Sequence, residues 1–155
     1  MRQFVCPACA AVNRAPDGKD PLSAKCGRCG ESLFKGHPAE VDAKSLAVHR
    51  ASTKGAAVLV DVWAAWCGPC RAMAPNFAAA AQTLEPDVRL LKLDSEAEPQ
   101  ASAQLRISGI PALLLFRDGQ EIARTAGLMS TQQIVAWTRQ ALTQAQARAS
   151  QGSRS

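Results

Sequence analysis

The sequence predicts an α/β fold, a mixed central sheet with helices on both faces, preceded by a small metal-binding segment. Three observations lead to this expectation. Apolar runs that suit buried strands alternate with segments of helical periodicity along residues 42–145. Asp118-Gly119 marks a hairpin between the last two strands. Two Cys-x-x-Cys pairs, separated by sixteen residues, precede this region.

Composition bounds the class of protein before any motif is considered. The chain has 155 residues, 47% of them hydrophobic, which is enough for one domain of ordinary size and a small appendage. Its formal net charge of +5 is a mild excess that suits a solvated basic surface, so we expect no nucleic-acid partner. No apolar run reaches the ~18 residues of a membrane span, so we expect no membrane partner. Nothing in the sequence demands an oligomer, and we expect a monomer.

The amino terminus and the cysteine count indicate the compartment. The first seven residues lack an apolar stretch followed by a small-residue cleavage site, so we expect no secretory signal and a cytoplasmic protein. Disulfides are rare in that reducing compartment. The six cysteines are therefore expected to be metal ligands or redox-active groups rather than structural cross-links.

Residues 1–35 carry the pattern of a four-cysteine zinc site. Each Cys-x-x-Cys pair suits a tight turn that aims two sulfurs at one point, and four thiolates complete a tetrahedral shell with no open position. The expected Zn²⁺ is therefore structural, and it would supply folding energy that a segment so poor in apolar residues cannot obtain by burial. Two disulfides, or four free thiols, are the alternative interpretation. The expected ligands of this zinc-ribbon or rubredoxin-like domain are Cys6, Cys9, Cys26 and Cys29.

A linker is expected over residues 36–41, because a glycine and a proline interrupt any regular pattern there. Asp42 then suits the N-cap of a short helix of about ten residues. His37 and His49 stand alone in the sequence, so both are expected at the surface rather than in a metal or acid–base site.

Residues 57–63 form an apolar run that predicts a central strand covered by helices on both faces. Asp61 is the exception in this run, because burial there would raise the pKa of its carboxyl group. Two interpretations remain open for it. It is either a proton acceptor for the buried thiol of Cys70 or a structural carboxylate held in a salt bridge.

The strand leads into Cys67-Gly68-Pro69-Cys70, at the start of an alanine-rich helix that continues to Leu84. A helix N-terminus presents unpaired N–H groups and partial positive charge, which favour a thiolate. Cys67, at the first position, is expected to be exposed and ionised, whereas Cys70, one turn later, is expected to be shielded. Apolar residues recur at helical spacing on the face formed by Met73, Phe77, Ala80 and Leu84.

The next strand is expected over residues 88–94. Lys92 lies on the same side of it as two apolar neighbours, so it is either a partly buried partner for Asp61 or a surface lysine whose stem covers apolar atoms. A helical segment follows over residues 95–106, opened by a Ser-x-x-Glu capping box at Ser95 and Glu98. The alternation of helices with these strands implies a parallel pair.

The remaining residues predict a hairpin and a last helix. A proline directly before the strand 112–116 restricts the preceding residue to an extended conformation, and the hairpin adds an antiparallel edge strand. Ser130 and Gln133 form another capping box at the start of the last helix. Residues 146–155 are polar and are expected to be a flexible tail.

Together these motifs resemble the thioredoxin family. The resemblance rests on the run from Val60 to Cys70 with its Trp-Cys-Gly-Pro-Cys motif, on Gly109-Ile110-Pro111, and on Ala126-Gly127. It covers about residues 40–145, in matching order and at matching intervals. With the four-cysteine segment in front, the chain is similar to the thioredoxin 2 group, bacterial thioredoxins with an N-terminal zinc-binding domain. The resemblance implies a thioredoxin fold for the domain at residues 42–145.

The resemblance also implies a role for each site residue. Cys67 would be the attacking thiol and Cys70 the resolving thiol, with Asp61 managing the proton of Cys70. Pro111 would be in the cis form and would place the backbone of Ile110 beside the sulfurs, where an extended target segment could pair.

Other residues would support that chemistry. Trp63 would pack behind the active site, and Lys92 would lie near the buried carboxylate. An apolar docking surface would comprise Trp66, Gly68, Pro69, Ile110, Gly127 and Leu128.

The function implied by the resemblance is that of a thiol–disulfide oxidoreductase, a cytosolic protein-disulfide reductase that donates electrons to disulfide-bonded target proteins. Its oxidised cysteine pair would be re-reduced by thioredoxin reductase, a flavin- and NADPH-dependent enzyme, and no organic cofactor would be bound. The alternative is a zinc-dependent, redox-responsive holdase in which the same fold only binds client proteins. Oxidised thiolates cannot hold a metal, so zinc release could be a regulatory step in either case.

Overall fold

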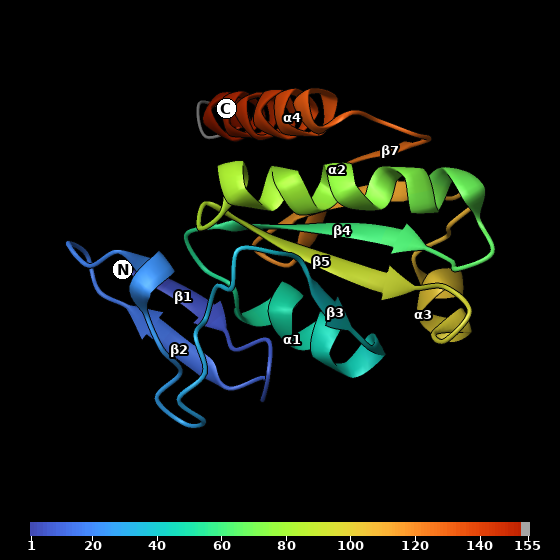
Figure 1. Ribbon diagram of the computed structural model, residues 1–155. Coiled ribbons are helices and arrows are strands. Elements are labelled where there is room, and N and C mark those ends of the chain that lie inside the picture. Colours follow the sequence, from blue (N-terminus) through green and yellow to red (C-terminus); the bar gives the residue numbers. More distant parts are fainter. Residues whose placement is uncertain (153–155) are drawn as a thin grey trace.

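A computed structural model describes residues 1–152 of the chain (Figure 1). Within that range, no helix combines the length and the apolarity needed to cross a bilayer. The larger part of the molecule is built from β3 (Ala39–Val41), α1 (Ala43–Ser52), β4 (Ala57–Trp63), α2 (Gly68–Leu84), β5 (Val88–Asp94), α3 (Pro99–Gln104), β6 (Ala112–Arg117), β7 (Gln120–Ala126) and α4 (Thr131–Gly152).

The central sheet has five strands in the order β3-β5-β4-β6-β7. Strand β4 lies in the middle and pairs in parallel with β5, which in turn pairs in parallel with β3. Strands β6 and β7 form the antiparallel hairpin at the other edge, and Asp118 and Gly119 both have positive φ angles at its turn. The expected mixed sheet, with its parallel pair and antiparallel hairpin, is therefore confirmed.

Helices cover both faces of this sheet (Figure 1). Alternate residues of β4 point to opposite sides, and each set joins its own core. Leu59 packs with the buried faces of α2 and α4, whereas Val60 packs with side chains of α1 and α3. The predicted α2 face is confirmed, since Met73, Phe77, Ala80 and Leu84 are all buried.

Local helix signals were partly confirmed. Asp42 caps α1 by accepting a hydrogen bond from the N–H of Ser45, and Ser130 and Gln133 exchange the hydrogen bonds of a capping box. The capping box expected at Ser95 and Glu98 is absent. Instead, Asp94 accepts hydrogen bonds from the backbone N–H groups that follow it, and α3 begins only at Pro99 without a side-chain cap.

Three other expectations are corrected. The linker 36–41 contains β3, which forms an edge of the main sheet. Residues 146–152, expected in a flexible tail, continue α4, because their alanines and glutamines favour a helix already nucleated by packing on α2. The rest of that expected tail, residues 153–155, lies outside the described residues. His49, expected at the surface, is buried in α1, and desolvation lowers its pKa to about 3.

Residues 1–35 form a separate small module. Strands β1 (Arg2–Val5) and β2 (Val12–Ala15) pair antiparallel, and a 3₁₀ turn, η1 (Pro21–Ser23), follows. The module has a small core in which the rings of Phe4 and Phe34 meet edge to face, with their centroids 5.0 Å apart.

This module packs against the amino-terminal ends of β4 and β5 (Figure 1). Arg89, at the start of β5, is almost fully buried. Its guanidinium donates hydrogen bonds to the carbonyl oxygens of Val5 and Leu33 at 3.3 and 2.7 Å, and it lies 4.0 Å from the ring centroid of Phe34. Buried Glu85 sits 3.7 Å from the same guanidinium. One arginine of the main sheet therefore holds the small module by its backbone.

Candidate active site and metal centre

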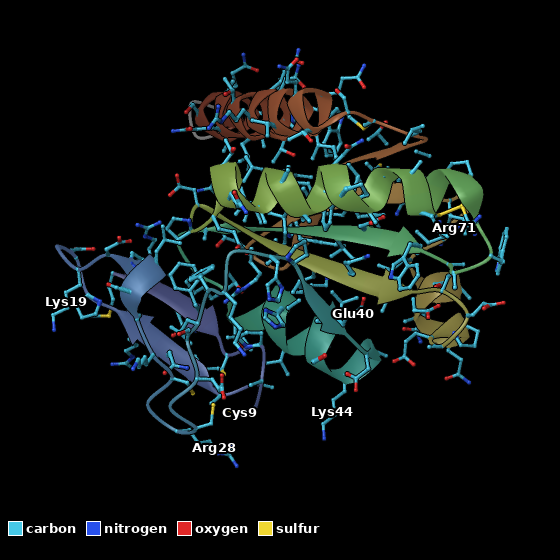
Figure 2. The ribbon with its side chains drawn as sticks, in the orientation of Figure 1. Cys9, Lys19, Arg28, Glu40, Lys44 and Arg71 are labelled. Carbon is cyan, nitrogen blue, oxygen red and sulfur yellow. A yellow bond between two sulfur atoms is a disulfide. The ribbon has the colours of Figure 1, made fainter. Side chains whose placement is uncertain are left out.

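The first site lies where β4 passes into α2, at the end of the sheet opposite to the module (Figure 2). Cys67 is the N-cap of α2, and its sulfur accepts a hydrogen bond from the N–H of Cys70 at 3.2 Å. The two sulfurs are joined in a disulfide, with their Cα atoms 5.2 Å apart. Helix N–H groups aimed at a sulfur stabilise a thiolate, so this position favours ionised Cys67 once the bond is reduced.

The expected exposure of Cys67 is wrong for this state of the protein. Its residue surface is only 4% exposed, since the disulfide packs against Ala64, Trp63 and Ile110. The sulfur pair nevertheless borders a groove open to solvent, because Cys67 is among the residues that line it. Access to the sulfur is therefore narrow and comes from one side.

Asp61 lies in the middle of β4, on the face covered by α2. It is 1% exposed, and neither carboxylate oxygen has a hydrogen-bond partner. Desolvation raises the pKa of Asp61 to about 7, against the attraction of Lys92 and with a smaller contribution from Glu40. A carboxyl group with a pKa near neutrality can both accept and release a proton under physiological conditions.

Lys92 is the neighbour of Asp61 on β5, in direct register. Among the described residues the two form no ion pair. The ammonium of Lys92 lies 4.5 Å from the ring centroid of Trp63 instead. The salt-bridged interpretation of Asp61 is therefore not supported, and Lys92 acts on it at longer range.

The loop before β6, which contains Ile110 and Pro111, also contacts the disulfide. Pro111 is cis, as expected, and the carbonyl oxygen of Ile110 lies 3.8 Å from the sulfur of Cys67. The N–H of Gly127 donates a 2.8 Å hydrogen bond to the carbonyl oxygen of Pro111, which joins the ends of β6 and β7 beside the site.

A groove of about 560 Å³ opens beside the disulfide. It brings together four of the six residues expected to dock targets, namely Trp66, Gly68, Pro69 and Ile110. Gly127 and Leu128 are not part of its lining, although Leu128 is 55% exposed. Sequence reasoning missed the opposite wall, which comes from Ser95, Ser102, Ala103, Ile107, Ser108 and Gly109. Apart from Gly109, which belongs to the Gly109-Ile110-Pro111 motif, the sequence carried no signal for that wall, because the serines, alanine and isoleucine around a short helix form no pattern of their own.

The second site is a cluster of four sulfurs in the module. Those of Cys6, Cys9, Cys26 and Cys29 all lie within 4.8 Å of one another. The two Cys-x-x-Cys turns share one backbone geometry. In each, the first cysteine accepts a hydrogen bond from the N–H four residues later, at Ala10 or Gly30, and this later residue has a positive φ of 63° or 80°.

The cluster fits a tetrahedral metal ion. A metal–sulfur bond of about 2.3 Å places tetrahedral sulfurs roughly 3.8 Å apart, and the pairs Cys6–Cys29 and Cys9–Cys26 are separated by 3.6 and 3.7 Å. The sulfur of Cys26 accepts hydrogen bonds from Asn13 and from the N–H of Arg28. Such donors orient a metal-bound thiolate and offset its charge.

The thiol acidities fit the same interpretation. The backbone N–H of Cys29 and the amide of Asn13 lower the pKa of Cys26 to about 6. For Cys29, the backbone at Glu31 acts in the same direction, but desolvation and the three neighbouring sulfurs outweigh it and raise the pKa to about 12. Four sulfurs this close cannot all be ionised without a cation between them.

Comparisons with known proteins identify the family of the main domain. A family model described as thioredoxin matches residues 43–140. Thioredoxin C-3 of Corynebacterium nephridii is 38% identical over 143 residues, which span 92% of this chain and 97% of that protein, so the alignment includes part of the module. Thioredoxin of Chlamydia muridarum is 46% identical over 78 residues, 50% of this chain and 76% of that protein. The solved structure of chloroplastic thioredoxin z, 27% identical, covers 69% of this chain and 96% of its own, with a TM-score of 0.62.

Proposed function

Since this chain belongs to the thioredoxin family and is a thiol–disulfide oxidoreductase, we propose that it reduces disulfides of other proteins through Cys67 and Cys70. The observation that carries the proposal is the cysteine pair at the N-terminus of α2, beside an open groove and directly after a strand that carries a buried carboxylate without a hydrogen-bond partner, Asp61.

Cys67 makes the first attack. Its position as the N-cap of α2 favours the thiolate, and its sulfur borders the groove from which a target approaches. The thiolate attacks one sulfur of the target disulfide, forms a mixed disulfide with it, and releases the other target sulfur as a thiolate.

Cys70 completes the exchange. It attacks the sulfur of Cys67, which forms the intramolecular disulfide and releases the target with two electrons gained. Its own proton must leave first, and Asp61 is the proposed acceptor, because its pKa is raised by burial to about 7 and its oxygens have no other partner. Lys92 and Trp63 are proposed to support this proton transfer by charge and by packing.

Targets are proposed to dock by their backbone in an extended conformation. The Ile110 backbone, next to cis Pro111, lies beside Cys67 and offers hydrogen-bonding groups to a target strand. The other proposed docking residues offer mostly small or apolar surface, and Trp66 is 65% exposed. They are Trp66, Gly68, Pro69, Gly127 and Leu128. A surface of this kind supplies affinity without demanding one target sequence.

The module is proposed to bind one structural Zn²⁺ through Cys6, Cys9, Cys26 and Cys29. Four cysteines held as thiolates suit a reducing compartment, so the cytoplasm is the proposed location. The reductant is proposed to be thioredoxin reductase, and the protein is proposed to act as a monomer.

A second candidate function concerns regulation. Cys29 is exposed, so an oxidant can reach this thiolate without unfolding the module. Oxidation would release the metal and free the module to bind client proteins, which is the role of a redox-responsive holdase.

The test is reduction of insulin by the purified protein, with a dithiol as the electron source. The Cys67→Ser variant should lose this activity by on the order of a thousandfold, because the covalent step is lost. The matched control is Cys29→Ser, which should lose metal and keep exchange. Insulin reduction that survives in Cys67→Ser would exclude the proposal.

A further inference from the structure

The far wall of the groove is formed by Ser95, by α3 and by the loop that leads to cis Pro111. Helix α3 has six residues and lacks a side-chain N-cap; Leu105 is its C-cap, and Arg106 after it has a positive φ of 57°. A helix this short is marginal by itself, so its position depends on what holds it from outside.

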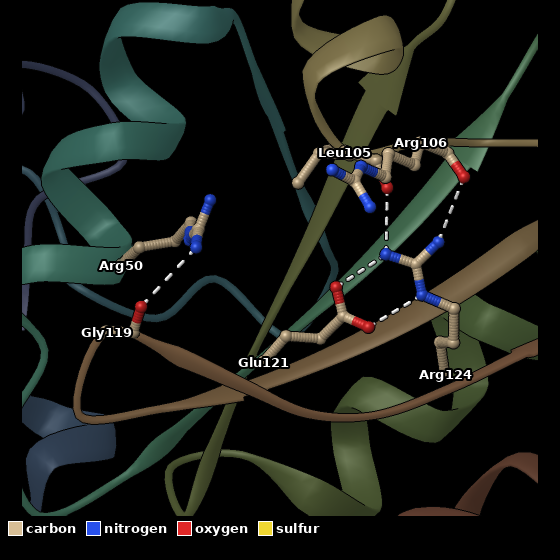
Figure 3. Close-up of polar contacts among 6 residues, drawn as sticks. All are labelled: Arg50, Leu105, Arg106, Gly119, Glu121 and Arg124. Carbon is tan, nitrogen blue, oxygen red and sulfur yellow. Dashed lines mark hydrogen bonds and ion pairs between the residues drawn. The ribbon is translucent and has the colours of Figure 1, made fainter.

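Arg124 of β7 is the polar group that holds the end of this helix (Figure 3). Its guanidinium donates hydrogen bonds to the carbonyl oxygens of Leu105 and Arg106, at 2.8 and 3.2 Å. The N–H groups of residues 105–107 already donate to the carbonyl oxygens of the last turn of α3. Arg124 binds the two carbonyls that follow this turn, where a cation is also favourable, and so ties the segment after α3 to β7.

Glu121 fixes Arg124 in turn. Both of its carboxylate oxygens accept hydrogen bonds from the guanidinium at 2.6 Å, in a two-pronged pair (Figure 3). An exposed ion pair contributes little by itself. Here the planar fork orients the remaining N–H groups toward α3, which a flexible ammonium cannot do.

The segment held in this way continues directly into the groove wall. Ile107 and Gly109 line the groove, and Ile110 lies beside the sulfur of Cys67. Leu105, Ile107 and Ile110 are only partly buried against the α1–α3 core. The position of this wall thus depends on two contacts, the partial burial of its apolar side chains in the core and the hydrogen bonds from Arg124.

We propose that Arg124, oriented by Glu121, is a positioning residue for disulfide exchange. It holds residues 105–110 as the wall against which an extended segment of a target protein docks. The inference rests on the proposed reduction of protein disulfides at this groove. A small disulfide needs only the sulfur of Cys67, so the contribution of Arg124 is specific for protein targets.

The test compares Arg124→Gln with the wild type on insulin and on a small linear disulfide. The KM for insulin should rise about three- to tenfold, while kcat and the rate with the small disulfide stay within about twofold. Arg124→Lys keeps the charge and one hydrogen bond, so it should recover part of the loss. Glu121→Gln should give a smaller rise than Arg124→Gln, and the double variant should be no worse than Arg124→Gln alone.

Arg50 is the matched control. It is also an arginine that donates to a backbone carbonyl, but to that of Gly119 at the turn of the hairpin, whereas Arg124 donates to Leu105 and Arg106 (Figure 3). Arg50→Gln should leave the insulin KM unchanged.

The outcomes separate the two proposals. Wild-type protein that fails to reduce insulin excludes the proposed function. Wild-type activity with an unchanged KM in Arg124→Gln overturns only the inference, as does an equal loss on both disulfides. Should Arg124→Gln not fold, Arg124→Lys decides, since its KM for insulin must also rise above the wild-type value.

Discussion

The chain contains three Cys-x-x-Cys pairs with the same spacing and two different surroundings. Cys67 and Cys70 start a helix of 17 residues, whereas the other two pairs lie in tight turns in which the residue directly after the second cysteine has a positive φ. In all three, a cysteine sulfur lies among backbone N–H groups or other sulfurs. What differs is where the second sulfur points.

On the helix, the pair closes on itself and borders a groove. In the turns, two pairs converge and leave space for one metal ion. The comparison teaches that spacing alone does not assign chemistry to a cysteine pair. The backbone after the first cysteine does, since a helix leads the chain away from the sulfurs and a turn brings it back.

Removal of the metal should produce the largest difference between the two regions, because only residues 1–35 should lose their structure. A structural zinc site contributes on the order of 10 kcal/mol to folding, and the small core of the module cannot replace it. Treatment with a strong chelator should therefore make residues 1–35 sensitive to protease, while insulin reduction stays within about twofold. Metal content by mass spectrometry and the cleavage pattern check this. A module that remains resistant without metal would mean that its fold depends on packing instead.

Asp61→Asn tests the catalytic region through pH. The folded protein holds a proton on Asp61 up to about pH 7, and the unfolded chain releases it near pH 4. Stability of the wild type therefore falls as pH rises from about 4 to about 7, and the penalty is complete above that range. The variant lacks the penalty, so it should be more stable by up to about 4 kcal/mol at pH 8 and equally stable near pH 3.5.

Urea unfolding at both pH values measures this difference. Other titrating groups, including buried Glu85, are common to both proteins and cancel in it. If Asp61 takes the proton of Cys70, the same variant should also resolve the mixed disulfide between Cys67 and the target at least about tenfold more slowly. A difference in stability that does not change with pH would show that Asp61 is ionised in the folded protein.

Arg89→Met tests what joins the two regions. The change leaves Glu85 buried without its cation and removes hydrogen bonds from the carbonyls of Val5 and Leu33. We expect a loss of about 3 kcal/mol in the free energy of unfolding, measured by urea. The double variant with Glu85→Gln should recover part of it. A loss confined to the module would instead mean that the regions unfold separately.

Ala10→Gly tests the two metal-binding turns against each other and should have the smallest effect on stability. Ala10 and Gly30 hold equivalent left-handed positions, and an alanine there costs about 1 kcal/mol that glycine does not. The variant should raise the thermal midpoint of the module slightly, and Gly30→Ala should lower it. Equal and opposite shifts support equivalence of the turns, whereas no shift for Ala10→Gly would mean that the strain is absent.

The sequence predicted what depends on local signals. The Asp118-Gly119 turn and the helix that starts at the Trp66–Cys70 motif each depend on a few adjacent residues and were found as expected, and the cis form of Pro111 agrees with what the resemblance implied. The predicted positions that need contacts across the chain were less reliable. His49 was expected at the surface, and nothing in the sequence singled out Arg89; the packing of the module and α1 beside β5 explains the burial of both.

The groove shows the same limit. Its near wall belongs to the motif, but its far wall depends on Arg124, which is eighteen residues from the carbonyl that it holds at Arg106. No local pattern links those positions. Strand β3 was missed for a similar reason, since three residues become a strand only because β5 lies beside them.

The position of the module at the amino-terminal ends of β4 and β5 has a practical consequence. Each of these strands has seven residues, so the two ends of the sheet are separated by roughly 20 Å. A surface, bead or fused protein attached through Met1 would therefore lie at the end of the molecule opposite to the disulfide and would not block an approaching target. Protein immobilised through Met1 should therefore keep its insulin-reducing activity, whereas attachment near Trp66 should reduce that activity.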